Sequence, residues 1–179
     1  MSEHPQEHIK YFWEDLPVGS MIEAGSTTVD RNEMLEFARK YDPQPFHLSD
    51  EAAAKSIFGK LLTSGWHTCA MAMGLMVRNF LNEASSLGSP GLEQIKWQKP
   101  VHADDTLTLR ARITESRPMK SHPDVGLTRV LWEMFNQHGE RVLLMDAYAM
   151  FRRRRPAVPG GSPSGHESGD DPVEHPGNA

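Results

Sequence analysis

The chain has 179 residues, a formal net charge of -5 and one cysteine, Cys69. This length allows a single domain with a substantial hydrophobic core. Four acidic and no basic residues lie in positions 156–179, so the rest of the chain is nearly neutral. That balance excludes the broad basic surface used to bind nucleic acid. A lone cysteine cannot form a disulfide within the chain, which favours a reducing, cytoplasmic compartment.

The two ends of the sequence differ in composition from its middle. Residues 156–179 are rich in Pro, Gly, Ser and acids, and residues 1–10 are similarly polar. Such segments bury too little apolar surface to offset the entropy lost on ordering. We therefore predict a flexible arm over 1–10, a single domain over 11–155 and a disordered tail over 156–179. We expect no membrane partner, because no apolar run has the length of a membrane span.

The first predicted elements are a strand and a helix. Residues 21–29 follow the turn Leu-Pro-Val-Gly and predict a strand. Asp30 then precedes a Glu by three residues, which is typical of a capping box at a helix start. Apolar residues recur at helical spacing as far as Tyr41, and Pro43 disfavours helical geometry at the residue before it. The sequence therefore places Asp42 at the end of this helix.

Two further helices are expected before the middle of the chain. Ser49 is followed by two acidic residues, which is typical of a helix N-terminus. From Gly65 to about Leu81 the sequence is apolar nearly all round. Such a helix is expected to be fully buried, so other elements must wrap it.

Four strands are expected in the second half of the chain. Residues 106–114 alternate strictly between apolar and polar, and residues 92–98 alternate around Ile95 and Trp97. Residues 127–137 and 141–151 flank the turn Gln-His-Gly-Glu and predict a hairpin. Together with the first strand this makes five strands. We predict an α+β domain in which a curled antiparallel sheet wraps the apolar helix.

Asp42 and His47 are the first candidates for chemistry. They lie in the sequence Tyr-Asp-Pro-Gln-Pro-Phe-His, whose two prolines restrict the backbone and so limit the relative motion of the pair. An ionised Asp accepts hydrogen bonds and a His accepts and donates them, so the pair can hold a water molecule and transfer its protons. The alternative is that Asp42 caps a turn and His47 is an ordinary loop residue.

Ser64 and Gly65 open the apolar helix and are predicted to bind substrate. Backbone amides at a helix N-terminus stabilise negative charge, and a glycine lets a ligand carbonyl approach closely. This arrangement suits an oxyanion hole. The alternative is that Ser64 is only an N-cap and Gly65 only a packing residue.

Three segments carry a resemblance to a known family. In order, YDPQPFH, FGKLLTSGWHT and IKWQKPVHADDTL resemble the MaoC-like dehydratases, (R)-specific enoyl-CoA hydratases of the hotdog fold, over about residues 12–151. The resemblance implies that Asp42 and His47 activate the water that adds to a 2-enoyl-CoA, and that the amide of Gly65 polarises the thioester carbonyl. It also implies a homodimer or a higher homo-oligomer. We expect neither a metal nor a cofactor. Gln44 and Ser64 depart from the Asn and His common in the family, which affects substrate identity.

Two other functions remain open at this point. Many hotdog acyl-CoA thioesterases use a carboxylate of the central helix, but residues 65–82 contain no Asp or Glu. A strand or loop acid such as Asp104 or Asp105 could serve instead. A non-catalytic acyl-CoA-binding protein would leave the Asp/His pair unexplained.

Other reactive residues are less favoured as sites. His67 and Cys69 are two residues apart and so point in different directions on a helix, which argues against metal or thiol chemistry. The run Arg152 to Arg155 is expected to be solvated, and contact with the phosphates of CoA is the alternative.

Overall fold

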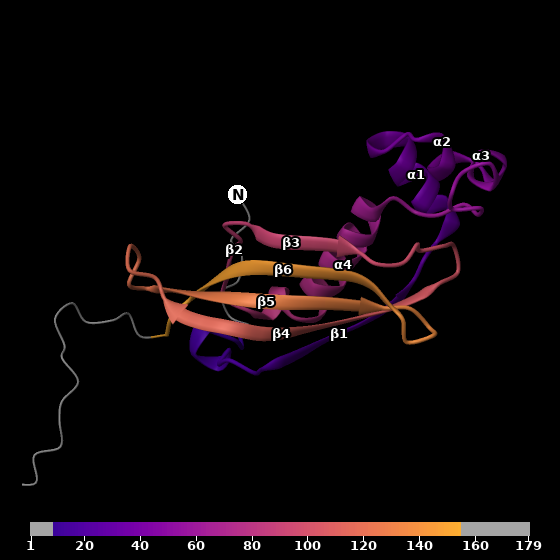
Figure 1. The fold of residues 1–179 in the computed structure, drawn as a ribbon. Coiled ribbons are helices and arrows are strands. Elements are labelled where there is room, and N and C mark those ends of the chain that lie inside the picture. The colour runs from indigo at the N-terminus through magenta and orange to yellow at the C-terminus, as the bar shows by residue number, and fades with distance from the viewer. Residues whose placement is uncertain (1–8, 155–179) are drawn as a thin grey trace, which may run out of the picture.

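An antiparallel sheet and one long helix form most of the computed structural model, which describes residues 9–154 (Figure 1). The strands lie in the order β1-β4-β5-β6-β2, and β3 also pairs with β6. Their bounds are β1 (Met21–Thr28), β2 (Ser86–Gly88), β3 (Leu92–Trp97), β4 (Thr106–Pro118), β5 (Val125–Phe135) and β6 (Arg141–Arg152). The predicted tail and most of the predicted N-terminal arm lie outside the described residues.

The strand predictions are confirmed with one omission. The strict alternation of β4 places one set of apolar side chains in the core, namely Leu107, Leu109, Ala111 and Ile113. The predicted hairpin joins β5 to β6, and its turn includes Gly139 at φ 74°, a conformation that glycine adopts readily. The described part of the sheet has six strands rather than the expected five. The omitted strand, β2, has three residues, too few for a periodic signal.

The helices are α1 (Arg31–Tyr41), α2 (Pro45–Leu48), α3 (Asp50–Ala54) and α4 (Gly65–Asn79), with short 3-10 turns η2 (Trp13–Asp15) and η3 (Leu81–Glu83). Helices α1, α3 and α4 begin where the sequence predicts, whereas α2 was not predicted. The carboxylate of Asp30 accepts from the N–H of Glu33 at 2.8 Å, and the hydroxyl of Ser49 accepts from the N–H of Ala52 at 3.1 Å. Each bond satisfies an amide that would otherwise lack a partner at the helix start.

Helix α4 packs against one face of the sheet. Its buried side contributes Met71, Ala72, Leu75 and Met76 to the core. The prediction that this helix is buried all round is wrong, because Trp66 is 57% exposed and Met73 is 45% exposed. The sheet of one chain covers only one side of the helix. An apolar stripe therefore remains uncovered within the described chain.

Strand β6 ends with Arg152, at the far end of the sheet from α1, α2 and α3 (Figure 1). Arg154 forms two hydrogen bonds to the carboxylate of Asp15, at 2.8 and 2.6 Å. Arg153 lies over the ring of Trp13 with 5.0 Å from its guanidinium carbon to the ring centroid, and it contacts Glu14 at 3.8 Å. Both arginines therefore fasten the end of β6 to η2, and Arg155 lies outside the described residues.

Helices α1, α2 and α3 gather beyond the opposite end of the sheet, next to the N-terminus of α4 (Figure 1). This arrangement brings the loop after α1 close to the segment that precedes α4. Among residues 9–154, no helix is both long enough and apolar enough to cross a membrane.

Candidate active site

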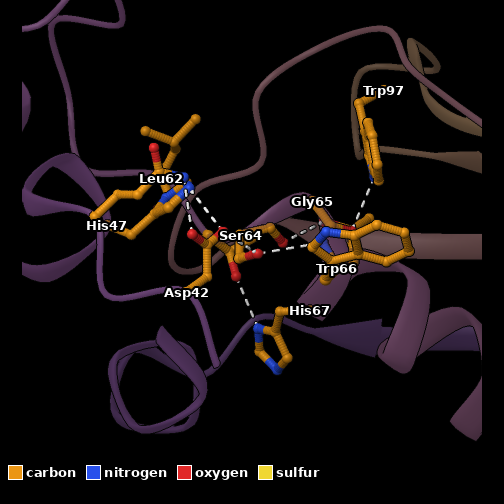
Figure 2. A network of polar contacts seen from close by, with 11 residues as sticks. Asp42, His47, Leu62, Ser64, Gly65, Trp66, His67 and Trp97 are labelled. Atoms are coloured by element: carbon orange, nitrogen blue, oxygen red, sulfur yellow. Dashed lines mark hydrogen bonds and ion pairs between the residues drawn. The ribbon is translucent and has the colours of Figure 1, made fainter. Parts of the chain in front are cut away.

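Asp42 and His47 face each other in the structure, with 3.4 Å between Asp42 Oδ2 and His47 Nε2 (Figure 2). Asp42 is the C-cap of α1, and Pro45 is the first residue of α2. The single turn of α2 carries His47 back towards the end of α1. The sequence predicted a proline-braced turn here, and the structure shows that the turn is a short helix.

A backbone carbonyl fixes the orientation of the His47 ring. His47 Nδ1 lies 2.9 Å from the carbonyl oxygen of Leu62. A carbonyl oxygen only accepts hydrogen bonds, so Nδ1 carries the proton and donates it. In the neutral ring Nε2 is then unprotonated, and it lies 3.4 Å from Asp42 Oδ2. Both atoms are hydrogen-bond acceptors, so the pair can accept hydrogen bonds from one water molecule.

Two donors hold the carboxylate of Asp42. The hydroxyl of Ser64 donates to Oδ2 at 2.7 Å, and the side-chain amide of Gln44 donates to Oδ1 at 2.8 Å. Burial raises the pKa of Asp42, but the hydrogen bonds from Ser64 and Gln44 and the proximity of His47 together outweigh it. The net effect lowers the pKa of Asp42, so this carboxyl group is ionised at neutral pH.

Ser64 is the N-cap of α4 and lies behind the site rather than on its surface. Its hydroxyl accepts from the N–H of Trp66 at 3.2 Å while it donates to Asp42. The residue is completely buried and is not among those that line the neighbouring cavity. We predicted from the sequence that Ser64 binds substrate together with Gly65. The structure instead engages its hydroxyl with Asp42 and with the helix start.

Gly65 is packed tightly against Trp97 of β3. A Cβ atom at position 65 would lie 2.7 Å from two atoms of the indole ring, which is too close for any side chain. The indole N–H of Trp97 also donates to the carbonyl of Gly65 at 2.9 Å. As the first residue of α4, Gly65 has an N–H without an acceptor inside the helix. Sequence analysis assigned Trp97 only to a strand, because nothing in the sequence marks it as a neighbour of Gly65.

A cavity of about 470 Å³ joins these groups. Asp42, His47 and Gly65 all line it. Much of the remaining wall is apolar or aromatic, including Phe46, Phe58, Leu62, Trp66, Trp97, Val101 and Val142. A cavity of this size, with an apolar wall and a few polar groups, is typical of a small-molecule site.

Asp104 and Asp105, the acids named above as candidates for a thioesterase, do not line this cavity. Asp105 accepts from the backbone N–H of His102 at 2.8 Å and from the side chain of Gln137 at 2.9 Å. Asp104 lies in the same loop with φ 69° and an exposed side chain. Both carboxylates therefore belong to the loop before β4.

The surroundings of His67 and Cys69 do not favour metal or thiol chemistry. His67 Nδ1 lies 2.7 Å from the hydroxyl of Thr63, and the ring stacks on Phe37 with 4.8 Å between centroids. Burial lowers the pKa of His67, although the nearby carboxylate of Glu33, 3.6 Å from Nε2, opposes this effect. Burial also raises the pKa of the Cys69 thiol, which makes it a weaker nucleophile at neutral pH. Within the described residues, no group of three or more His, Cys, Asp or Glu side chains is placed to hold a metal ion.

Comparison with known proteins places the chain in a family. The sequence model of the MaoC like domain matches residues 17–132, which is more than half of the chain. The chain belongs to the MaoC-like domain family. The crystal structure of the MaoC-like dehydratase from Rhodospirillum rubrum is similar, with 36% sequence identity and a TM-score of 0.75. That similarity covers 80% of this chain and 98% of the R. rubrum chain.

Two more distant relatives extend the comparison of this MaoC-like protein. The (R)-hydratase from A. caviae has 20% sequence identity to this chain and a TM-score of 0.62. The similarity covers 78% of this chain and 99% of the A. caviae chain. The protein YdeM from Bacillus subtilis (strain 168) is 23% identical over 140 residues, which cover 78% of this chain and 98% of YdeM. These similarities confirm the predicted hotdog fold. The family supports a hydratase or dehydratase activity in general terms.

Proposed function

We propose that this MaoC-like protein is a hydro-lyase that reversibly hydrates a 2-enoyl-CoA to a 3-hydroxyacyl-CoA. The observation that carries the proposal is that Asp42, His47 and Gly65 line one cavity. Reversible hydration of an enoyl thioester needs a group that moves a proton and a group that stabilises negative charge on the thioester oxygen. The Asp42/His47 pair supplies the group that moves the proton. The N–H of Gly65 supplies the group that stabilises the negative charge.

In this proposal the thioester carbonyl accepts a hydrogen bond from the N–H of Gly65. This N–H lies at the positive end of the α4 helix dipole, where negative charge is favoured. As water attacks C3, the electrons of the C2–C3 double bond move towards the thioester oxygen. One donor aimed at that oxygen typically lowers the barrier by about 3 kcal/mol. Close packing by Trp97 holds the backbone at Gly65 in place.

His47 is the group that we propose to move the proton. Its Nε2 is unprotonated, because Nδ1 donates to Leu62, and the residue lines the cavity. When the C3–O bond forms, Nε2 takes one proton from the attacking water, and the ionised carboxylate of Asp42 stabilises the imidazolium. The enolate then takes this proton at C2 and regains its carbonyl. The net change is addition of H to C2 and OH to C3, and dehydration is the reverse.

The same geometry disfavours the other functions weighed from the sequence. A thioesterase would use Asp104 or Asp105, and neither lines the cavity. A protein that only binds acyl-CoA would not need a carboxylate held by two donors beside a histidine of fixed orientation. We retain both as alternatives that the experiment below distinguishes.

We further propose that the protein is a cytoplasmic homodimer. The exposed apolar stripe of α4, which includes Trp66, Ala70 and Met73, continues onto Trp97 of β3, whose ring lies 5.3 Å from that of Trp66. Strand β3 pairs only with β6 in the described chain, so its other edge is available. A second copy is an occupant that buries both the stripe and this edge.

Light scattering coupled to size-exclusion chromatography tests the dimer. We expect the wild-type protein to have twice the mass of one chain. The substitution M73E places a charge in the apolar stripe and is expected to shift the mass towards one chain. A wild-type protein with the mass of one chain over the working concentration range would contradict the proposal.

The proposed activity is tested with a panel of 2-enoyl-CoA thioesters. Loss of the conjugated enoyl absorbance and release of free thiol are followed in the same reaction. We expect the first signal without the second. Release of thiol would indicate the thioesterase instead, and saturable binding without either signal would indicate a non-catalytic binding protein.

A further inference from the structure

We propose that Ser64 is a positioning residue that aims and holds the carboxylate of Asp42, rather than a residue that contacts substrate. This inference rests on the proposed function, because it assigns Ser64 a role in the same site. It revises our expectation from the sequence, in which Ser64 binds substrate together with Gly65.

Each of the two carboxylate oxygens of Asp42 accepts a hydrogen bond from a different side chain. Ser64 donates to Oδ2 at 2.7 Å and Gln44 donates to Oδ1 at 2.8 Å. Because the two donors hold different oxygens, together they prevent rotation of the carboxylate about its last bond. Oδ2 is also the oxygen nearest to His47 Nε2, at 3.4 Å. Ser64 therefore fixes the atom of Asp42 that faces the imidazole.

Ser64 and the other donor, Gln44, differ in their exposure to solvent. Gln44 has an exposed side chain, whereas Ser64 is completely buried. A buried hydrogen bond to a charged group is stronger and less variable than one that competes with water. Ser64 is thus the more rigid of the two anchors. Its burial and its absence from the cavity wall also exclude direct contact between its hydroxyl and a ligand in that cavity.

The hydroxyl of Ser64 also connects Asp42 to helix α4. It accepts from the N–H of Trp66 at 3.2 Å while it donates to Asp42 (Figure 2). An acceptor bond strengthens the donor bond of the same hydroxyl. The positive end of the helix dipole therefore acts on the carboxylate through Ser64 and favours its ionised form. Gly65, the first residue of this helix, follows Ser64 directly, so one short segment holds both halves of the proposed site.

Ser49 provides a matched comparison within the chain. It is the N-cap of α3, and its hydroxyl accepts from the N–H of Ala52 in the same manner. Its hydroxyl contacts no residue of the site, and Ser49 itself is exposed. The substitution S49A therefore removes an N-cap without altering Asp42. S64A removes both an N-cap and a donor to Asp42.

The direct test is an NMR titration of the Asp42 carboxyl carbon in the wild type, S64A and S49A. We expect the pKa of Asp42 to rise in S64A, because the donor that favours the carboxylate is lost, and to stay at its wild-type position in S49A. S64G is the second variant, since glycine is a good N-cap and keeps the helix start intact where alanine does not. We expect S64G to shift the titration in the same direction as S64A.

The kinetic test uses the same variants with the enoyl-CoA that the wild type hydrates best. We expect S64A and S64G to lower kcat by about 10- to 100-fold, as misplacement of a catalytic group does, with KM changed by less than about threefold. The acid limb of the kcat profile is expected to move to higher pH. S49A is expected to retain the wild-type kcat and profile.

The two measurements separate this inference from the proposed function. If the wild type hydrates no enoyl-CoA, the proposed function fails, and the NMR titration still decides whether Ser64 controls Asp42. If Asp42 titrates at the same pH in S64G as in the wild type, the inference is overturned. A rise in KM with kcat unchanged would also overturn it, because that result would mark Ser64 as a substrate-binding residue.

Discussion

His47 and His67 are two buried histidines with similar contacts, but only His47 belongs to the candidate site. Each is bonded through Nδ1 to the segment before α4, His47 to the carbonyl of Leu62 and His67 to the hydroxyl of Thr63. Each has a carboxylate near Nε2, at 3.4 Å for Asp42 and 3.6 Å for Glu33. By the distance between imidazole and carboxylate alone, the two pairs are nearly equivalent.

The difference lies in the carboxylates and in access. The side chain of Asp42 is 18% exposed and is held by two donors, whereas that of Glu33 is 66% exposed. His47 lines the cavity, and His67 does not. His67 Nε2 is buried without a hydrogen-bond partner in the structure. The comparison teaches that a His/carboxylate pair forms a candidate site only where the carboxylate is fixed and both groups face a cavity.

Removal of the fixed pair is expected to have the largest effect. D42N and H47Q should each lower kcat by about 10²- to 10⁴-fold, because a general acid/base group contributes about that much. Circular dichroism should show an unchanged fold. E33Q, the matched change in the second pair, should stay within about threefold of the wild type in an enoyl-CoA hydration assay. A loss in E33Q equal to that in D42N would show that the fixed carboxylate is not the decisive difference.

The backbone beside the fixed pair is expected to be nearly as sensitive. G65A places a Cβ atom 2.7 Å from the rigid indole of Trp97, so the helix start or the ring must move. We expect kcat to fall by about 10- to 1000-fold, and the free energy of unfolding to fall by about 1–3 kcal/mol. Urea denaturation measures the second effect.

The double variant G65A/W97A is the control for this contact. Removal of the indole leaves space for the new methyl group, so G65A should cost less stability in the W97A background than in the wild type. Equal costs in both backgrounds would show that the close packing of Trp97 does not explain the glycine.

The smallest expected effect concerns His67 and the pH dependence of stability. Its pKa is lowered in the folded protein, so the unfolded chain binds more protons near and below the ordinary value of 6.5. The contribution of neutral His67 to the free energy of unfolding is therefore fully present above pH 6.5. It is lost as the pH falls from 6.5 through the lowered pKa of His67 in the folded protein. One proton accounts for a slope of at most about 1.4 kcal/mol per pH unit.

Urea denaturation between pH 5 and pH 8, a window chosen around the ordinary histidine pKa of about 6.5, measures this slope. H67Q should have a shallower slope than the wild type, because it removes the group that titrates. H138Q, which alters an exposed histidine in the turn between β5 and β6, is the control for removal of a histidine from the surface. A slope that is the same in H67Q and the wild type would show that His67 does not link folding to protons.

Much of the fold was predictable because local signals and tertiary structure agree. The cap at Asp30 and the proline at 43 bound α1, and strict alternation identified β4. The burial of α4 was overestimated, because an apolar sequence pattern does not show which surface covers each side chain. Trp66 and Met73 are apolar and belong to this pattern, yet they are exposed because the sheet of one chain covers only the other side of the helix.

The site was predictable in its residues but not in its connections. The spacing of Asp42 and His47 indicated a pair, and the prolines indicated that it is held stiffly. The bonds of His47 to Leu62 and of Asp42 to Ser64 join segments 15 and 22 residues apart in the chain. Such contacts depend on how α1 and α2 dock beside α4, and no local pattern encodes that docking. The contact of Trp97 with Gly65 was missed for the same reason.

The fastening of β6 to η2 has a practical consequence for handling the protein. Arg154 and Asp15 join the end of β6 to η2, and β6 ends at the end of the sheet that lies away from α1 and α2 (Figure 1). A surface linker attached on η2 or at the end of β6 therefore leaves from one place, away from α2, whose residues Phe46 and His47 line the cavity. Immobilised protein should consequently remain accessible to thioesters in solution.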